Sequence, residues 1–168
     1  MVEKGLLLIF QVLLIHCLHS QTLNFHNYYV SDGLAQSQIT DIVSDSKGNI
    51  WFSTYGSGVD QFDGKNFINY GLNQGFRHHQ VMKLYINEAQ QIWCGLEQGF
   101  ISVITNGEVI NIDYPNGEDE EVTAIGGLSD KVIVGTRSGN LYSIDKSFNV
   151  KQIANYNGRT IEDVIVVD

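Results

Sequence analysis

The stretch Ile50-Trp51-Phe52-Ser53-Thr54 lies between the turn residues 45–49 and 56–58, and its pattern recurs along the chain. It returns as Ile92-Trp93-Cys94-Gly95-Leu96 and, more loosely, as Val132-Ile133-Val134-Gly135-Thr136. The repeat length is about 42 residues and then about 40 residues. A period near 40 with aromatic and β-branched content is typical of a β-propeller, in which each repeat forms one blade. This pattern decides the fold class.

Each repeat divides into four strand-like runs separated by turn residues. In the first repeat the runs are residues 39–43, 50–54, 59–62 and 66–70. Asp63-Gly64, between the last two runs, is a strong hairpin signal. The later repeats keep the order, with runs at 81–85, 92–95, 100–103, 109–112, 122–125, 132–135, 141–144 and 150–153. The sequence therefore predicts an all-β chain built of four-stranded antiparallel blades.

The phase of the repeats predicts how the chain is divided. We expect a signal peptide at 1–20 and a partial propeller at 21–168. Within the propeller the predicted parts are blades at 33–72, 73–114 and 115–156, the start of another blade at 157–168, and an outer strand at 22–28 that would close the last blade. This amounts to about three and a quarter blades, whereas rings have about four to eight. We therefore expect the chain to be the N-terminal part of an incomplete ring.

The first twenty residues have a different composition from the repeats. Lys4 precedes an apolar run at 5–18, and the small residue Ser20 stands before an expected cut at Gln21. The run is short for a membrane helix and is typical of a secretory signal peptide. Retention of the segment, or lipidation at Cys17, are the alternatives. Cleavage would leave Cys94 as the single cysteine, which excludes an internal disulfide.

Composition and charge exclude some classes of partner. The 168 residues are 43% hydrophobic and 17% charged, and the net charge is −9. Such an acidic chain lacks the clustered Lys and Arg that a nucleic-acid backbone requires, so no nucleic acid is expected as a partner. The acidic run 118–121 is interpreted as a solvated loop, and a divalent-ion site is the alternative.

The first repeat resembles the repeat of the two-component regulator propeller family. The residues that carry the resemblance are Gly33-Leu34, Ile39, Ile42, Asp45, Gly48–Thr54, Gly58-Val59 and Phe62-Asp63-Gly64. The second repeat keeps Gly75, Val81 and Trp93, but Leu96 replaces the threonine. The third repeat has Ile133 in place of the tryptophan. The resemblance is therefore close in the first repeat and loose afterwards.

The resemblance implies a periplasmic sensor of a bacterial histidine kinase, including hybrid two-component systems. In that family two seven-bladed rings usually precede a β-sandwich, a membrane helix and cytoplasmic signalling domains, and many members bind breakdown products of polysaccharides. It implies that this part of the chain is not an enzyme and that any kinase activity lies beyond Asp168. The implied partners are a small-molecule or oligosaccharide ligand, the remaining blades and downstream domains, and a second copy of the full-length sensor.

The repeats contain no motif that predicts catalysis, a cofactor or a metal site. The adjacent His78 and His79 lack a third ligand, and the loop 45–49 lacks the bidentate acid of a calcium loop. Trp51 and Trp93 recur at one strand position, which favours packing between blades over a sugar platform. We therefore expect neither a catalytic residue nor a cofactor in this chain.

A ligand, if one binds, is expected where the blade connections and the turns between second and third strands meet. Tyr55, Arg77, His78 and Arg137 lie in those segments and are the candidate ligand-binding residues. Arginine can grip a carboxylate with two hydrogen bonds, and a tyrosine ring can stack on a sugar. The alternatives are that these are ordinary loop residues, that they belong to a secreted lyase acting on an antibiotic or uronic-acid polymer, or that the propeller is a scaffold for protein contacts.

Overall fold

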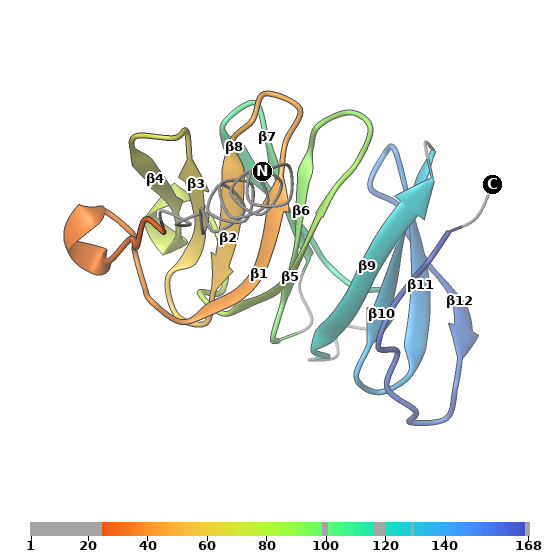
Figure 1. Ribbon diagram of the computed structural model, residues 1–168. Coiled ribbons are helices and arrows are strands. Elements are labelled where there is room, and N and C mark those ends of the chain that lie inside the picture. Colours follow the sequence, from red (N-terminus) through yellow and green to blue (C-terminus); the bar gives the residue numbers. More distant parts are fainter. Residues whose placement is uncertain (1–24, 99–100, 116–119, 129, 167–168) are drawn as a thin grey trace, which may run out of the picture.

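The computed structural model describes residues 25–98, 101–115, 120–128 and 130–166. It contains three four-stranded antiparallel sheets, and in each sheet neighbouring strands follow the order of the chain (Figure 1). Blade 1 comprises β1–β4, blade 2 comprises β5–β8 and blade 3 comprises β9–β12. The predicted signal peptide at 1–20 lies outside the described residues. No helix in the described part is long and apolar enough to cross a membrane.

The strands lie where the repeats predict them. Blade 1 has β1 (Ile39–Ser44), β2 (Ile50–Thr54), β3 (Gly58–Phe62) and β4 (Phe67–Tyr70). Blade 2 has β5 (Val81–Ile86), β6 (Ile92–Leu96), β7 (Ile101–Thr105) and β8 (Glu108–Ile112). Blade 3 has β9 (Val122–Leu128), β10 (Lys131–Thr136), β11 (Asn140–Asp145) and β12 (Val150–Asn155). Two 3₁₀ turns, η1 (Val30–Asp32) and η2 (Leu72–Gln74), precede blades 1 and 2. The prediction of an all-β propeller fold is confirmed.

An aspartate fixes the hairpin between β1 and β2. One carboxylate oxygen of Asp45 accepts the backbone N–H groups of Lys47 and Asn49, each at 2.9 Å. The other oxygen accepts the side-chain amide of Asn49 and the indole N–H of Trp51. Partial burial works to raise the pKa of Asp45, but these hydrogen bonds prevail and lower it. The residues predicted as a turn therefore also hold the tryptophan of β2.

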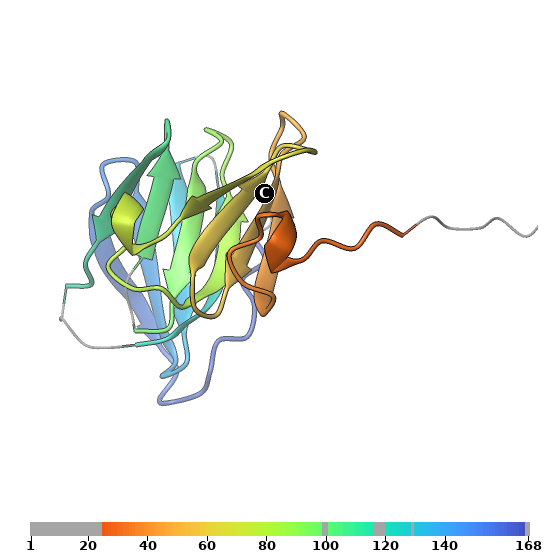
Figure 2. The ribbon, with the colours of Figure 1, turned by 90° about the vertical axis from the view of Figure 1, so that its left-hand side faces the viewer.

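The blades stack face to face, and blade 2 lies between the other two (Figure 2). One hydrophobic core joins blades 1 and 2, and its members include Trp51, Val59 and Cys94. A second core joins blades 2 and 3, and its members include Trp93 and Val134. Trp51 and Trp93 are 5% and 2% exposed, so the prediction that both pack between blades is confirmed.

Small residues allow the first strand of each following blade to approach closely. A Cβ atom on Gly95 would lie 2.4 Å from a methyl carbon of Val122, at the start of β9. A Cβ atom on Gly135 would lie equally close to Ile161, which follows blade 3. Ile161 also donates its backbone N–H to the carbonyl of Thr136 at 3.1 Å. The segment that starts at Ile161 therefore lies against blade 3 as β9 lies against blade 2.

The predicted outer strand at 22–28 is described from residue 25 onwards. Residues 25–28 form no strand. The ring of Tyr28 lies 4.7 Å from that of Phe62 and 5.7 Å from that of Phe67, so the segment contacts blade 1. Its role in closing a last blade remains a prediction, because no described residues form that blade.

Candidate functional site at the turns between second and third strands

Three equivalent turns bring a tyrosine, a glutamate and an arginine to one end of the blades. Tyr55, Glu97 and Arg137 are the first residues after β2, β6 and β10, and we call them the turn row. Each donates its backbone N–H to a carbonyl in the segment that leads into its own blade. The bonds run from Tyr55 to Gln38 (3.1 Å), from Glu97 to Gln80 (3.1 Å) and from Arg137 to Glu121 (3.0 Å). The expectation that the blade connections and these turns share one end is thus confirmed.

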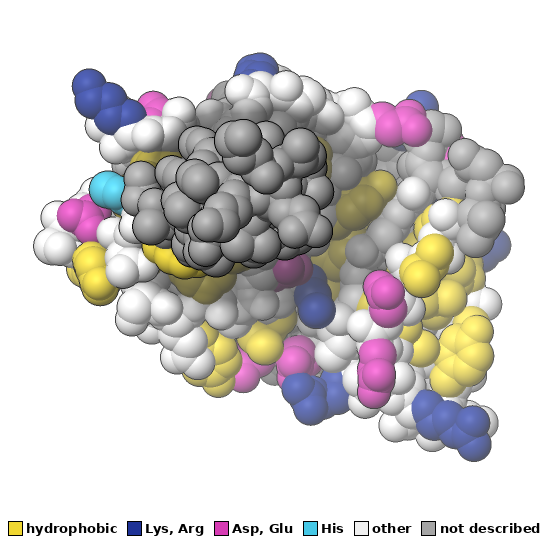
Figure 3. Space-filling view, in the orientation of Figure 1, with side chains coloured by type: hydrophobic (Ala, Val, Ile, Leu, Met, Phe, Trp, Pro, Cys, Tyr) yellow, Lys and Arg dark blue, Asp and Glu magenta, His cyan; other side chains and the backbone are white. Residues whose placement is uncertain are grey.

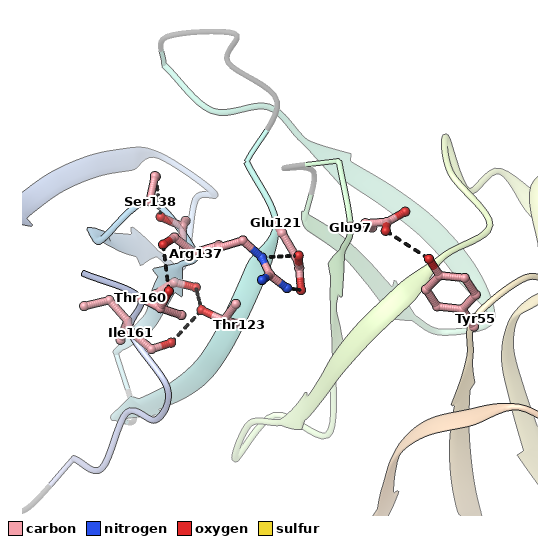
Figure 4. A network of polar contacts seen from close by, with 10 residues as sticks. Tyr55, Glu97, Glu121, Thr123, Arg137, Ser138, Thr160 and Ile161 are labelled. Atoms are coloured by element: carbon pink, nitrogen blue, oxygen red, sulfur yellow. Dashed lines mark hydrogen bonds and ion pairs between the residues drawn. The ribbon is translucent and has the colours of Figure 1, made fainter. Parts of the chain in front are cut away.

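The side chains of the turn row interact across blades. The hydroxyl of Tyr55 in blade 1 donates to Oε1 of Glu97 in blade 2 at 3.2 Å (Figure 4). On the other side, the hydrogen bond and charge of Glu121 raise the pKa of Arg137, and the charge of Glu97 adds to the effect. Glu97 therefore lies within electrostatic reach of both candidate residues, Tyr55 and Arg137.

Glu121 holds Arg137 with two hydrogen bonds. Nε of Arg137 lies 2.5 Å from Oε2 of Glu121, and Nη2 lies 2.7 Å from Oε1 (Figure 4). The Glu121 side chain is 16% exposed, whereas that of Arg137 is 65% exposed. Such a bidentate pair fixes the plane of the guanidinium group and leaves its remaining N–H groups toward solvent. A ligand carboxylate would have to compete with Glu121 for the same fork.

The interpretation of 118–121 as a solvated loop is wrong for its last two residues, and 118–119 lie outside the described part. Glu121 pairs with Arg137, as above. Glu120 is 8% exposed, and its carboxylate accepts the side-chain amide of Asn140 at 2.5 Å. The physical reason is register: Glu121 directly precedes β9, and its carbonyl is already bonded to the Arg137 amide. That bond brings the two side chains together.

Arg77 and His78 take part in other contacts. Arg77 forms an ion pair with Asp113, just after β8, and both side chains are about half exposed. The ring of His78 stacks on that of His79, with centroids 5.0 Å apart and an angle of 10° between planes. The carbonyl of His79 accepts the N–H of Gly58, so this connection passes beside the same turn as Tyr55. The structure thus pairs Tyr55 with Glu97 and Arg137 with Glu121, and it places Arg77 and His78 in the adjoining connection.

The buried Cys94 thiol is poorly suited to act as a nucleophile. Burial raises the pKa of the Cys94 thiol well above its usual range, which disfavours the thiolate needed for nucleophilic attack. Within the described ranges, no group of three His, Cys, Asp or Glu side chains is placed to hold a metal ion.

Sequence reasoning did not single out Glu97 and Glu121 as site residues. A signal for Glu97 was present, because it falls at the repeat position of Tyr55 and Arg137. The role of Glu121 had no such signal, since its partner is set by the pairing of the β9 entry with the β10–β11 turn.

The fold and the first repeat both match known proteins. Residues 33–56 match the sequence model of the two component regulator propeller family. No curated protein matches the chain. Among solved structures, the chain is similar to the extracellular domain of a putative hybrid two component system from B. thetaiotaomicron, with 20% identity and a TM-score of 0.74. That match covers 86% of this chain and 21% of that chain, so this chain spans about a fifth of the sensor domain.

Two further structures share the fold. Virginiamycin B lyase from Staphylococcus aureus has 16% identity and a TM-score of 0.63, over 72% of this chain and 42% of that chain. A computationally designed protein has 16% identity and a TM-score of 0.61, over 89% of this chain and 88% of that chain. At these identities the likeness concerns the fold. The chain therefore has a β-propeller fold, and its residues 33–56 match the repeat of the two component regulator propeller family.

Proposed function

We propose that this chain is part of the ligand-sensing propeller of a two-component signalling sensor, located in the periplasm or outside the cell, and that it is not itself catalytic. Two findings support the proposal. The first repeat matches the regulator propeller family, and the fold is similar to the extracellular domain of a hybrid two component system. The expected signal segment at 1–20 would direct the chain across the membrane.

The observation that carries the binding proposal is the convergence of the turn row with Glu121. Three neighbouring blades supply a hydroxyl, two carboxylates and a guanidinium group at one end of the stack. Hydroxyl-rich ligands need both donors and acceptors, and the ring of Tyr55 adds an apolar face. These features favour an oligosaccharide, such as a polysaccharide breakdown product. A ligand that binds through a carboxylate would first have to displace Glu121.

Calorimetry of the intact protein with neutral and acidic oligosaccharides tests this proposal. We expect the double variant Arg77→Ala, Arg137→Ala to weaken binding at least about tenfold. The reason is that losing a charge-assisted hydrogen bond to the ligand lowers the affinity by about that factor or more. The matched control is Lys47→Ala, Lys65→Ala, which removes the same charge from turns at the opposite end of blade 1. Unchanged affinity in the arginine variant would remove these residues from the site.

Because the fold is similar to that of a lyase, the same experiment also tests whether the protein cleaves the oligosaccharide. After calorimetry the oligosaccharide is recovered and its chain length measured. A sensor releases the ligand unchanged, whereas a lyase produces shortened chains with a new double bond. Binding of a protein instead of any saccharide would favour the scaffold alternative.

A further inference from the structure

A cleft opens between blades 2 and 3 at the end of the stack opposite the turn row. Its volume is about 430 Å³, within the range of small-molecule sites. The β5–β6 turn (Asn87–Gln91) and Trp93 line one side, and residues 130–132 and 144–146 line the other.

In blade 1 the tryptophan at the equivalent position has a hydrogen-bond acceptor for its indole N–H. The indole N–H of Trp51 donates to Oδ2 of Asp45 at 3.0 Å. The same oxygen also accepts the side-chain amide of Asn49 at 2.8 Å. One carboxylate oxygen therefore accepts two donors, and no polar group is left over.

Blade 2 has the same tryptophan without that acceptor. Trp93 is 2% exposed, and its Nε1 has no hydrogen-bond partner among the residues that the structure describes. Asn87 stands at the position of Asp45. Its Oδ1 accepts the N–H of Gln91, and its Nδ2 donates to Oε1 of Gln91. The position of the acceptor oxygen in blade 1 is thus taken by an amide group whose nitrogen donates to Gln91, and Trp93 Nε1 has no acceptor there.

The seam between blades 1 and 2 is also bridged by the protein. Oε1 of Gln90 in the β5–β6 turn accepts the N–H of Ser46 in the β1–β2 turn at 2.8 Å. At the seam between blades 2 and 3, Glu88 occupies the position of Ser46, and among the described residues no hydrogen bond joins the β5–β6 turn to blade 3. A buried N–H without an acceptor destabilises the folded protein, and a bound acceptor would remove that cost.

The lining defines the chemistry of that acceptor. Three carboxyl groups (Glu88, Asp130 and Asp145) and two ammonium groups (Lys131 and Lys146) line the cleft, so it does not attract an anion. Ala89, Val132 and Ile144 add an apolar surface. A hydroxyl group fits because it can accept from Trp93 and donate to a carboxylate at the same time.

We propose that the cleft between blades 2 and 3 is a second binding site for a small neutral polyhydroxy compound, such as a monosaccharide or cyclitol, whose oxygen accepts the Trp93 indole N–H. This site goes beyond the sensing function proposed for the turn row. It is at the other end of the blades and uses none of the same residues, so either site can fail alone.

The two tryptophans of the chain give a direct readout, because each contributes one indole N–H resonance. The intact protein is titrated with D-glucose, D-xylose and myo-inositol, and the resonances are assigned with Trp51→Phe. We expect at least one compound to shift the Trp93 resonance saturably and to leave the Trp51 resonance in place. The anion succinate is expected to produce no such shift.

Asn87→Asp is the decisive variant, because it gives Trp93 the acceptor that Trp51 has. We expect it to weaken binding at least about tenfold while the fold is kept. The mirror variant Asp45→Asn, which takes the acceptor from Trp51, should leave the affinity unchanged. The proposal is overturned if none of the three compounds shifts the Trp93 resonance saturably. That result would mean that only a water molecule accepts the Trp93 indole N–H. Equal affinity in Asn87→Asp, or stronger binding of succinate, would overturn it as well.

Discussion

Asp60 in β3 is a fully buried carboxyl group held by two hydrogen bonds. It accepts the backbone N–H of Ala35 at 2.8 Å and the side-chain amide of Asn69 at 2.9 Å. Burial raises its pKa above the ordinary value of 3.8, and the hydrogen bonds oppose that effect only in part. In blade 2 the equivalent pair is Ser102 and Asn111, joined by a 2.7 Å hydrogen bond that involves no charge.

We predict that Asp60 makes the folded protein lose stability as the pH rises. The folded state holds the proton more tightly than the unfolded state, so the free energy of unfolding falls between pH 3.8 and the raised pKa. Asp60→Ser, which copies blade 2, should lack this component. The measurement is urea denaturation of the wild-type protein and the variant at several pH values between 3.8 and the raised pKa of Asp60. As the pH rises, the free energy of unfolding of the variant should increase relative to that of the wild-type protein.

Asp63 provides the matched control for this titration. It lies in the exposed β3–β4 turn, where the N–H groups of Asn66 and Lys65 lower its pKa. Its contribution is present above the unfolded pKa of 3.8 and is lost as the pH falls below that value, so Asp63→Ser should give a slope of opposite sign in this lower pH range. Equal slopes for the two variants would contradict the assignment of Asp60.

At the residue scale the sequence predicts burial better than hydrogen bonding. The recurrence of Trp51 and Trp93 is enough to predict that both pack between blades. It does not predict that one indole N–H is paired and the other is not, because that depends on how Asp45 and Asn87 orient their oxygens within a turn.

At the scale of elements, the repeat predicts every strand of the three blades. β-branched and aromatic residues alternate with turn residues at a regular spacing, and each turn is short enough to force antiparallel pairing. The contacts between turns of different blades are not predictable in this way. The Tyr55–Glu97 bond joins residues that are distant in sequence, and it depends on how one blade is rotated against the next.

We predict that Gly95→Ala in β6 separates blades 2 and 3. The new methyl group would lie 2.4 Å from Val122, which is fully buried at the start of β9. Overpacking of this kind costs about 1–3 kcal/mol, so the midpoint of urea unfolding should fall. Ser53, at the same position in β2, carries a side chain whose hydroxyl lies 2.8 Å from that of Thr40.

A double-mutant cycle separates this clash from a simple change in strand propensity. Val122→Ala removes the contact at 2.4 Å and leaves the Cβ of Val122 at 2.8 Å, so it relieves part of the clash, and the double variant should lose less stability than the sum of the single variants. Additive losses would mean that the close approach of β9 is not what requires glycine.

At the scale of the molecule, blade 2 belongs to two cores at once. Cys94 and Val59 lie in the core shared with blade 1, and Val134 lies in the core shared with blade 3. The period of the repeats predicts this stacking, because a blade with two apolar faces needs a neighbour on each. The geometry of the site was less predictable: Tyr55 and Arg137 were expected at one end, but their carboxylate partners depend on the packing of the blades.

We therefore predict that the three blades open together, with the thiol of Cys94 as the reporter. Cys94 is fully buried in the central blade, and burial raises its pKa, so labelling by a thiol reagent requires opening. In a Cys17→Ser background it is the single thiol of this chain. Val59→Ala and Val134→Ala each remove buried methyl groups, at a cost on the order of 1–3 kcal/mol.

Both substitutions should accelerate labelling of Cys94 in proportion to the free energy of unfolding that each removes, about tenfold for each 1.4 kcal/mol. This should hold for Val134→Ala even though Val134 and Cys94 lie in different hydrophobic cores. The measurement is the labelling rate at several urea concentrations, compared with the free energy of unfolding by circular dichroism. If Val134→Ala lowers that free energy without changing the labelling rate, then blade 3 unfolds separately. Acceleration by both substitutions in proportion to the stability that each removes means that the three blades unfold as one cooperative unit.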